Sequence, residues 1–265
     1  MRLAHGRRAA LLPLWRDLLV FALKEARACL FGGLMVALLI GTHLVYPRDA
    51  LLARYDFLFL GALGIQAALL VFKLETWEEA QVILCFHLVG TAMELFKTAA
   101  GSWIYPEEAI FRLGGVPLFS GFMYAAVGSY IARAWRILDL RFHRYPPRWA
   151  TVALAVAIYL NFFAHHYMVD LRLGLFAASA AVFGRTTIFF TADRTHRLPL
   201  TVGFMLVALF IWFAENVGTF TGTWLYPNQQ AAWQPVGLAK LGSWYLLMII
   251  SFVLVSLVHR PDGQT

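Results

Sequence analysis

The sequence has few charged residues, and it has no polar segment longer than a loop. Charged residues make up 14% of its 265 residues, whereas a soluble domain carries about 25% because its surface faces water. The hydrophobic share is 60% and the mean hydropathy is +0.66. We therefore expect one membrane-embedded unit without a water-soluble domain.

Common catalytic signatures are also missing. The sequence has no Walker motif, Gly-x-Ser-x-Gly motif, Rossmann fingerprint or kinase signature, which argues against ATP-driven transport by this chain. Its two cysteines, Cys29 and Cys85, stand alone in apolar runs without the spacing of a metal site or a disulfide framework. We predict that both are small buried packing residues.

Eight apolar stretches are long enough to cross a bilayer, because about 20 helical residues span about 30 Å of hydrocarbon. Before them, residues 9–25 alternate apolar pairs with Arg16, Asp17 and Lys24, a pattern typical of an amphipathic helix on the membrane surface. The predicted fold class is therefore an all-α, polytopic membrane protein. The predicted spans are 27–46, 51–72, 77–97, 112–135, 149–168, 171–192, 198–218 and 237–258.

Lys and Arg residues are concentrated on one side of these spans. With the N-terminus inside, the inner segments hold fifteen of the 22 Lys and Arg residues and the outer segments hold five. This bias follows the positive-inside rule, so we predict cytoplasmic N- and C-termini. The net charge of +7 then reflects topology and contact with membrane lipids, which argues against nucleic acid as a partner. The Arg-rich segment 133–148 is interpreted in the same way.

One motif occurs twice. ELFKTAAGSWIYP at 94–106 and ENVGTFTGTWLYP at 215–227 both fit E-x6-G-[ST]-W-[IL]-Y-P, with an offset of 121 residues. The same offset relates Asp49 to Asp170 and superposes the first four spans on the last four. In each motif the Gly permits a left-handed turn or a close approach of chain segments, and the Pro prevents the helix from continuing.

Four spans in each half imply that both halves enter the membrane in the same direction. We predict two parallel four-helix repeats, 27–147 and 148–258. An N-terminal cytoplasmic or interfacial segment, 1–26, precedes them, and a cytoplasmic tail, 259–265, follows. Both motifs then lie at the outer side of the membrane.

The duplicated glutamates lead the candidate site residues. A carboxyl group inside an apolar span is costly unless it has a partner or a function, whereas the motif aromatics are also ordinary interfacial anchors. Polar residues at a similar depth complete an outer cluster, in which Lys97 and Asn161 also lie. The candidate catalytic residues are Glu94, Glu215, His165, His166 and Asp170, and the candidate substrate-binding residues are Trp103, Tyr105, Trp224, Tyr226, His87, Arg185 and Lys240.

Three interpretations of this cluster stay open. Buried glutamates with raised pKa values serve general acid–base catalysis. The His, Asp and Glu side chains also suit a metal, but adjacent histidines on a helix point about 100° apart and no HExxH spacing occurs, so no metal ligand is assigned. Packing or ion pairing, such as Glu94 with Lys97, is the third. Arg185, deep in the sixth span, fits either a buried salt bridge or recognition of an anionic group.

The chain resembles a bacterial family of multi-spanning membrane proteins known as domain of unknown function 817, over about residues 25–258. The resemblance rests on ELFKTAAGSWIYPE, GVPLFSGFMYAAVGSYIARAWR, NFFAHHYMVDLR and FIWFAENVGTFTGTWLYPNQ. It implies the bacterial inner membrane but no established activity. Glu215 to Gly222 and Gly115 to Leu118 are also similar to segments of membrane carotenoid hydratases, although Trp-Leu-Tyr-Pro replaces the Pro-Phe-Gly of that family.

The function that these features favour is an intramembrane enzyme acting on a lipid or isoprenoid at the outer leaflet through the paired glutamates. The alternative is a secondary transporter or permease with its site between the repeats and a polar path through His87 and Arg185. A structural or assembly subunit is the third class. The sequence leaves the cofactor, the substrate and the oligomeric state open.

Overall fold

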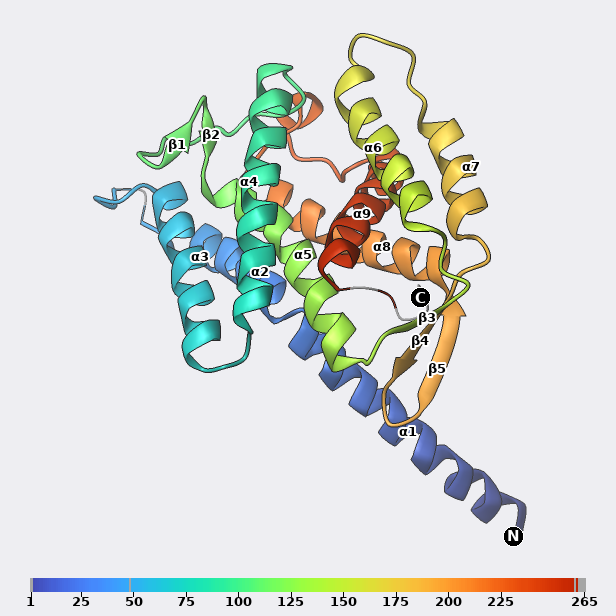
Figure 1. Ribbon diagram of the computed structural model, residues 1–265. Coiled ribbons are helices and arrows are strands. Elements are labelled where there is room, and N and C mark those ends of the chain that lie inside the picture. The colour runs from blue at the N-terminus through green and yellow to red at the C-terminus, as the bar shows by residue number, and fades with distance from the viewer. Residues whose placement is uncertain (1, 48, 260, 262–265) are drawn as a thin grey trace.

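The computed structural model describes residues 2–47, 49–259 and 261, with side chains from Leu14 onward. It is mostly helical (Figure 1). The helices are α1 (Arg2–Ala28), α2 (Leu30–Val45), α3 (Arg54–Val71), α4 (Trp77–Ala99), α5 (Phe119–Ile137), α6 (Arg148–Ala164), α7 (Arg172–Phe183), α8 (Leu200–Phe220) and α9 (Ala239–Val258), with a 3-10 turn at Pro227–Gln229. The strands are β1 (Arg112–Leu113), β2 (Val116–Pro117), β3 (Arg141–His143), β4 (Thr187–Thr191) and β5 (Thr195–Pro199).

Among the described residues, four helices are long and apolar enough to cross a membrane, namely α3, α4, α8 and α9. A fifth span results if the bent pair 14–28 and 30–45, which meet at 70°, counts as one. Helices α6 and α7 are apolar but shorter. The prediction of a helical protein with several membrane-length helices is confirmed, and the number of eight stays a prediction.

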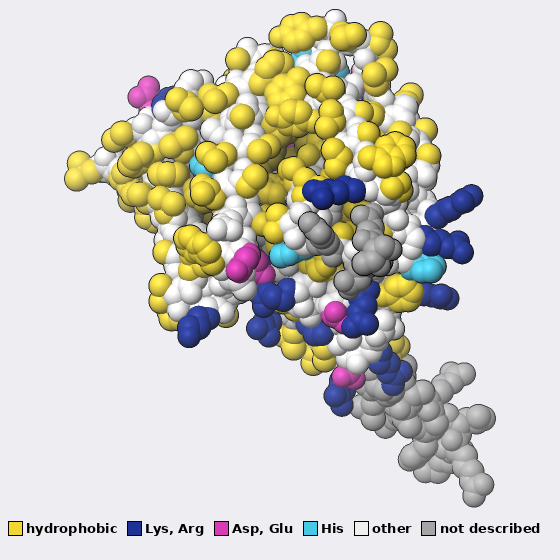
Figure 2. Space-filling model, in the orientation of Figure 1, with side chains coloured by type: hydrophobic (Ala, Val, Ile, Leu, Met, Phe, Trp, Pro, Cys, Tyr) yellow, Lys and Arg dark blue, Asp and Glu magenta, His cyan; other side chains and the backbone are white. Residues whose placement is uncertain are grey.

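Large apolar side chains point outward along these helices. Leu88 on α4 is 62% exposed and Phe210 on α8 is 73% exposed. Figure 2 shows hydrophobic side chains across the upper part of this face, whereas Lys and Arg gather below, near the strands and α1. An apolar patch of this extent is unusual on a soluble monomer but normal where a protein faces lipid.

The predicted span 112–135 begins later than expected. Residues 112–117 form a tight antiparallel turn, in which Leu113 pairs with Val116. Gly114 and Gly115 have φ values of 53° and 87°, a left-handed conformation that glycine adopts without a steric penalty. Helix α5 therefore starts at Phe119.

The predicted span 171–192 is also different, and the prediction of an all-α fold is wrong here. Helix α7 ends at Phe183, and β4 then pairs with both β3 and β5 in a three-stranded antiparallel sheet. The run TTIFFT of β4 is rich in β-branched and aromatic residues, which favour a strand over a helix. The length of the apolar stretch suggested a span, whereas its residue types favour a strand.

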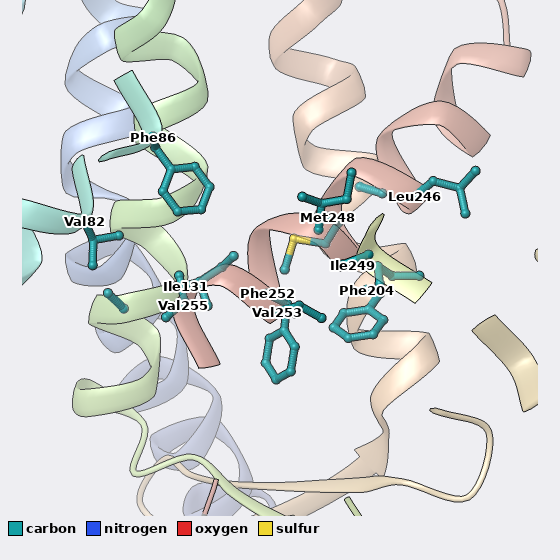
Figure 3. Packing of buried hydrophobic residues seen from close by; sticks show 14 of the residues in the cluster. Val82, Phe86, Ile131, Phe204, Leu246, Met248, Ile249, Phe252, Val253 and Val255 are labelled. Carbon is teal, nitrogen blue, oxygen red and sulfur yellow. The ribbon is translucent and has the colours of Figure 1, made fainter. Parts of the chain in front are cut away.

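The helices pack in pairs that the offset of 121 relates to one another. Helix α4 packs along α5 as α8 packs along α9, and α2 contacts α5 as α6 contacts α9. A continuous core joins both halves. Figure 3 shows Phe86 of α4 and Ile131 of α5 on one side of it and Phe204 of α8 with Phe252 of α9 on the other.

The bundle has two different ends (Figure 1). We call the end with residues 94–118 and 215–238 the motif end, and the end with the three-stranded sheet the sheet end. At the sheet end, Asp17 of α1 accepts hydrogen bonds from the backbone N–H groups of Asp193 and Arg194 and contacts His196 Nε2 at 2.5 Å. The predicted amphipathic helix is thus held by its polar face against the β4–β5 turn.

Two expectations about single residues are wrong. Arg133 was expected in a basic segment that contacts membrane lipids, but it is 2% exposed on α5, where its Nη2 donates to the carbonyl oxygen of Arg27 at 2.6 Å. Helix α5 extends to Ile137 and carries Arg133 toward the α1–α2 bend, which explains the burial. Cys29, between α1 and α2, and Cys85 on α4 were expected to be buried, but both are exposed.

Candidate functional site

Glu94 lies at the centre of a hydrogen-bonded cluster at the motif end. Its carboxylate accepts hydrogen bonds from Trp103 Nε1 at 2.7 Å, from the Tyr105 hydroxyl at 2.7 Å and from the Tyr124 hydroxyl at 2.8 Å. The side chain is only 3% exposed. Three donors to one carboxylate satisfy its acceptor oxygens and offset part of the cost of its burial. The expected ion pair between Glu94 and Lys97 is not formed.

Glu215 has a closely similar environment. Its carboxylate accepts hydrogen bonds from the Tyr226 hydroxyl and from Trp244 Nε1, the latter at 2.6 Å, and the residue is 4% exposed. Tyr226 is the motif tyrosine that corresponds to Tyr105 at the offset of 121. Each motif therefore folds back so that its own tyrosine binds its own glutamate.

Glycine makes this return of the chain sterically feasible. Gly101 and Gly222 occupy the same place in the two motifs, and their φ values are 71° and 66°. The left-handed turn that the sequence predicts at both glycines is confirmed. A side chain at either position would strain the backbone, because the Cβ atom disfavours positive φ.

The two motifs are joined by an antiparallel pair of backbone hydrogen bonds. Ile104 and Leu225 exchange both backbone hydrogen bonds, at 2.9 and 3.0 Å. Beside them the rings of Trp103 and Tyr226 meet edge to face at 6.0 Å. Since Trp103 donates to Glu94 and Tyr226 donates to Glu215, the two carboxylates belong to one buried network.

The two motif tyrosines remain protonated donors. Burial, together with the negative charge of Glu94, holds the pKa of Tyr105 well above its usual range. Burial and the charge of Glu215 do the same for the pKa of Tyr226. Both hydroxyls therefore keep their protons at any physiological pH and serve as fixed hydrogen-bond donors.

A cavity of about 280 Å³ opens beside Glu215. Helices α4, α6 and α9 and both motifs form its wall. Its polar residues lie toward the motifs, and its apolar residues come from α6 and α9. The lining residues are Lys97, Ser102, Trp103, Tyr124, Ile158, Asn161, Phe162, His165, Arg172, Glu215, Tyr226, Ala239, Lys240, Ser243, Trp244, Leu246 and Leu247.

Three cationic side chains face this cavity. Lys240 Nζ lies 4.1 Å from the centre of the Tyr226 ring and 5.5 Å from that of Trp103, in cation–π contacts. Lys97 Nζ lies 2.9 Å from His166 Nε2 and 4.1 Å from the centre of the Phe162 ring. Arg172 is paired with Asp170 at 2.5 Å.

Comparison with known proteins shows the family of this chain. Residues 17–252 match the family described as protein of unknown function DUF817. The chain belongs to this family. The uncharacterised protein YoaT of Bacillus subtilis (strain 168) is 43% identical over 251 residues, which is 94% of each chain. The resemblance predicted from the motifs is thus confirmed, and it brings no activity with it.

A solved structure has a related fold. The crystal structure of a cross-linked MvINS trimer aligns with a TM-score of 0.51, over 72% of this chain and 98% of that chain. The aligned residues are 12% identical, so the likeness concerns the fold alone.

The predicted polar residues of α6 and its following loop lie at the edge of the cavity in this DUF817 chain. His165 lines it, while His166 is exposed beside Lys97. Burial and the positive charge of Lys97 lower the pKa of His166. Burial raises the pKa of Asp170, but hydrogen bonds from Arg172 outweigh this effect and lower it.

Four predicted substrate-binding residues lie outside the cavity. Tyr105 donates its hydroxyl hydrogen bond to Glu94 and does not line the cavity. Trp224, in the segment after α8, packs against Gly218 of that helix, and His87 packs its ring on Phe122 of α5 at 4.3 Å. The expectation that Arg185 is deep in a span is wrong, because it lies exposed in the turn between α7 and β4. The early end of α7 at Phe183 puts Arg185 at the sheet end.

Several site residues had no signal in the sequence. Tyr124 and Trp244 lie in mid-helix among other aromatic residues, 30 and 29 positions from the glutamates that they bind. Arg172 was predicted only as one of the five Lys and Arg residues in the outer segments. Among the described residues of the DUF817 chain, no group of three or more His, Cys, Asp and Glu side chains is placed to hold a metal ion.

Proposed function

We propose that this chain is a multi-pass membrane enzyme that acts on a lipid or isoprenoid held in the cavity beside Glu215. The observation that carries the proposal is the cavity itself, since it combines a buried carboxylate, three cations and an apolar wall. Ligand sites are concave and mostly apolar, with a few convergent polar groups. We propose that a ligand with a hydrocarbon tail enters this cavity from the bilayer, between the apolar helices that line it.

The proposal gives the two glutamates different roles. Glu215 lines the cavity and has two donors, so its carboxylate retains the capacity to accept a proton from, or return one to, a bound substrate. Glu94 has three donors and does not line the cavity. It positions Trp103 and Tyr124, which form part of the cavity wall.

We also propose that the chain consists of two parallel repeats of four spans. The antiparallel exchange of hydrogen bonds between Ile104 and Leu225 supports this, because these residues are 121 positions apart and so hold equivalent places in the two motifs. The concentration of Lys and Arg near the sheet supports a cytoplasmic sheet end. A fluorescent protein fused after Thr265 should then be bright, whereas a periplasmic C-terminus would leave it dark.

The enzymatic role predicts a large effect of Glu215→Gln. The substitution keeps the size of the side chain but removes its proton-transfer capacity, so the product should decrease by about 100-fold or more. The measurement is untargeted lipid and terpenoid profiling of a deletion strain that carries either the natural chain or the variant. Glu108→Gln, at an exposed position outside the cavity, is the matched control and should behave like the natural chain. Identical profiles of the deletion and complemented strains would contradict an enzymatic role.

No observation favours the transporter. Neither His87 nor Arg185, which the transporter path requires, lines the cavity. The faint similarity to carotenoid hydratases is compatible with an isoprenoid as the substrate with which Glu215 exchanges a proton.

A further inference from the structure

We propose that the ligand of this cavity carries a phosphate-type anionic head group, bound by Lys97, Arg172 and Lys240. This inference names the substrate class and rests on the proposed lipid site. It starts from the placement of the cations, all three of which line the cavity. Two of the four lysines of the sequence are therefore gathered at one place.

Lys97 has unused hydrogen-bonding capacity. It is only 3% exposed, and its ammonium group has one hydrogen-bond partner, His166. An ammonium group has three donors, so two remain available on the cavity side. A buried ammonium group is costly unless it is paired. Among the described residues, no carboxylate lies within ion-pair distance of Lys97 or Lys240.

The cations also act on one another. The positive charges of Lys240 and Arg172 are close enough to repel that of Lys97. Lys240 is attracted by the carboxylate of Glu215 and repelled by Arg172. Such a cluster is stabilised when an anion enters between its members. Arg172 adds geometric selectivity, because a guanidinium group binds phosphate oxygens through more than one N–H group.

The corresponding place in the other half of the chain has no such site. At the offset of 121, Lys97 corresponds to Gly218, Arg172 to Leu51 and Lys240 to Phe119. Phe119 is fully buried in the packed aromatic cluster around Tyr55. The cations come from both halves, Lys97 from the first and Arg172 and Lys240 from the second, and they gather at only one of the two places that the offset relates. Packing requirements shared by both halves do not explain it, whereas binding of a ligand on one side does.

The apolar wall specifies the rest of the ligand. Ile158, Phe162, Leu246 and Leu247 line the cavity away from the motifs. A volume of about 280 Å³ is at the lower end of the range for ligand sites. It accommodates a head group and the start of a chain, and the remainder of the chain lies along the lipid-facing helices.

The test is binding of three probes to the full chain purified in detergent, followed by the fluorescence of the tryptophans, of which Trp103 and Trp244 line the cavity. The probes are dioleoyl phosphatidic acid, dioleoylglycerol, which lacks only the phosphate, and inorganic phosphate. We expect phosphatidic acid to bind at least about tenfold more tightly than dioleoylglycerol. The variant Lys97→Met/Lys240→Met should lose this preference, and the control Lys73→Met, at an exposed loop lysine, should retain it.

The other outcomes separate this inference from the proposed function. Equal binding of both lipids, unchanged in the double variant, overturns the anionic head group but leaves the lipid site intact. Binding of none of the three probes overturns both proposals. Lysine-dependent binding of inorganic phosphate alone supports anion recognition with a free phosphate as its source and overturns a lipid ligand. The comparison of the two lipids on the natural chain needs no variant, so a double variant that does not fold still leaves a decisive result.

Discussion

Glu94→Ala is expected to destabilise the protein severely. The substitution leaves the Trp103 indole N–H and the hydroxyls of Tyr105 and Tyr124 without their acceptor in a buried place. A buried donor that loses its partner costs about 1–3 kcal/mol, so three of them should cost about 3–6 kcal/mol after some relaxation. This is comparable to the whole stability of many proteins.

The measurement is the melting temperature of the detergent-solubilised protein, followed by size-exclusion chromatography of the heated sample. Glu108→Ala removes an exposed glutamate and should melt like the natural chain. Glu94→Gln should fall between the two, because the amide keeps one oxygen acceptor but presents an N–H group to a donor. An unchanged melting temperature of Glu94→Ala would show that the cluster does not hold the motif end together.

Gly218→Ala is expected to destabilise the protein through a direct clash. A Cβ atom at Gly218 would lie 1.9 Å from Cη2 of Trp224. Because Trp224 is itself buried, its ring has to move and disturb the second motif. Overpacking of this kind costs about 1–3 kcal/mol or more.

Gly174→Ala on α7 is the matched control for this substitution. No atom lies within 4 Å of a Cβ atom at Gly174. An added methyl group there should raise stability by about 0.5–1 kcal/mol, because alanine favours a helix interior over glycine. The two alanine variants should therefore shift the melting temperature in opposite directions. A rise for Gly218→Ala would contradict the close packing of Trp224 on α8.

The sequence predicts the centre of the site well because the duplication makes it visible. Glu94 and Glu215 are costly residues in apolar helices, and their recurrence with Trp, Tyr and Gly at fixed spacing predicts that they share a role. The structure puts both carboxylates in one buried network. Local spacing was sufficient here, since each glutamate binds the tyrosine that follows it in its own motif.

The remaining site residues depend on tertiary packing, which no local pattern encodes. Tyr124 reaches Glu94 only because α4 and α5 pack along each other, and Trp244 reaches Glu215 through the equivalent packing of α9 on α8. Arg185, in contrast, is a residue whose position was predicted wrongly. Apolar content alone placed it inside a span, although the β-branched run after it forms a strand.

The proposed ligand site depends on a difference between two places that the offset of 121 relates. Lys240 and Ser243 line the cavity, whereas their counterparts at the offset of 121, Phe119 and Phe122, are buried apolar core residues. Replacing Lys240 and Ser243 by phenylalanine gives the cavity wall the two apolar side chains that fill the corresponding place around Phe119 and Phe122. The variant Lys240→Phe/Ser243→Phe should therefore fill the cavity while preserving the fold.

Native mass spectrometry of this double variant beside the natural chain tests the account most directly. Both proteins are purified from the same membranes in the same mild detergent, and the lipids that remain bound are released and identified. We predict that the natural chain retains a bound lipid or isoprenoid and that the cavity-filled variant, with an unchanged melting temperature, retains none. The same molecule bound in equal amounts to both proteins would contradict the assignment of this cavity as the binding site.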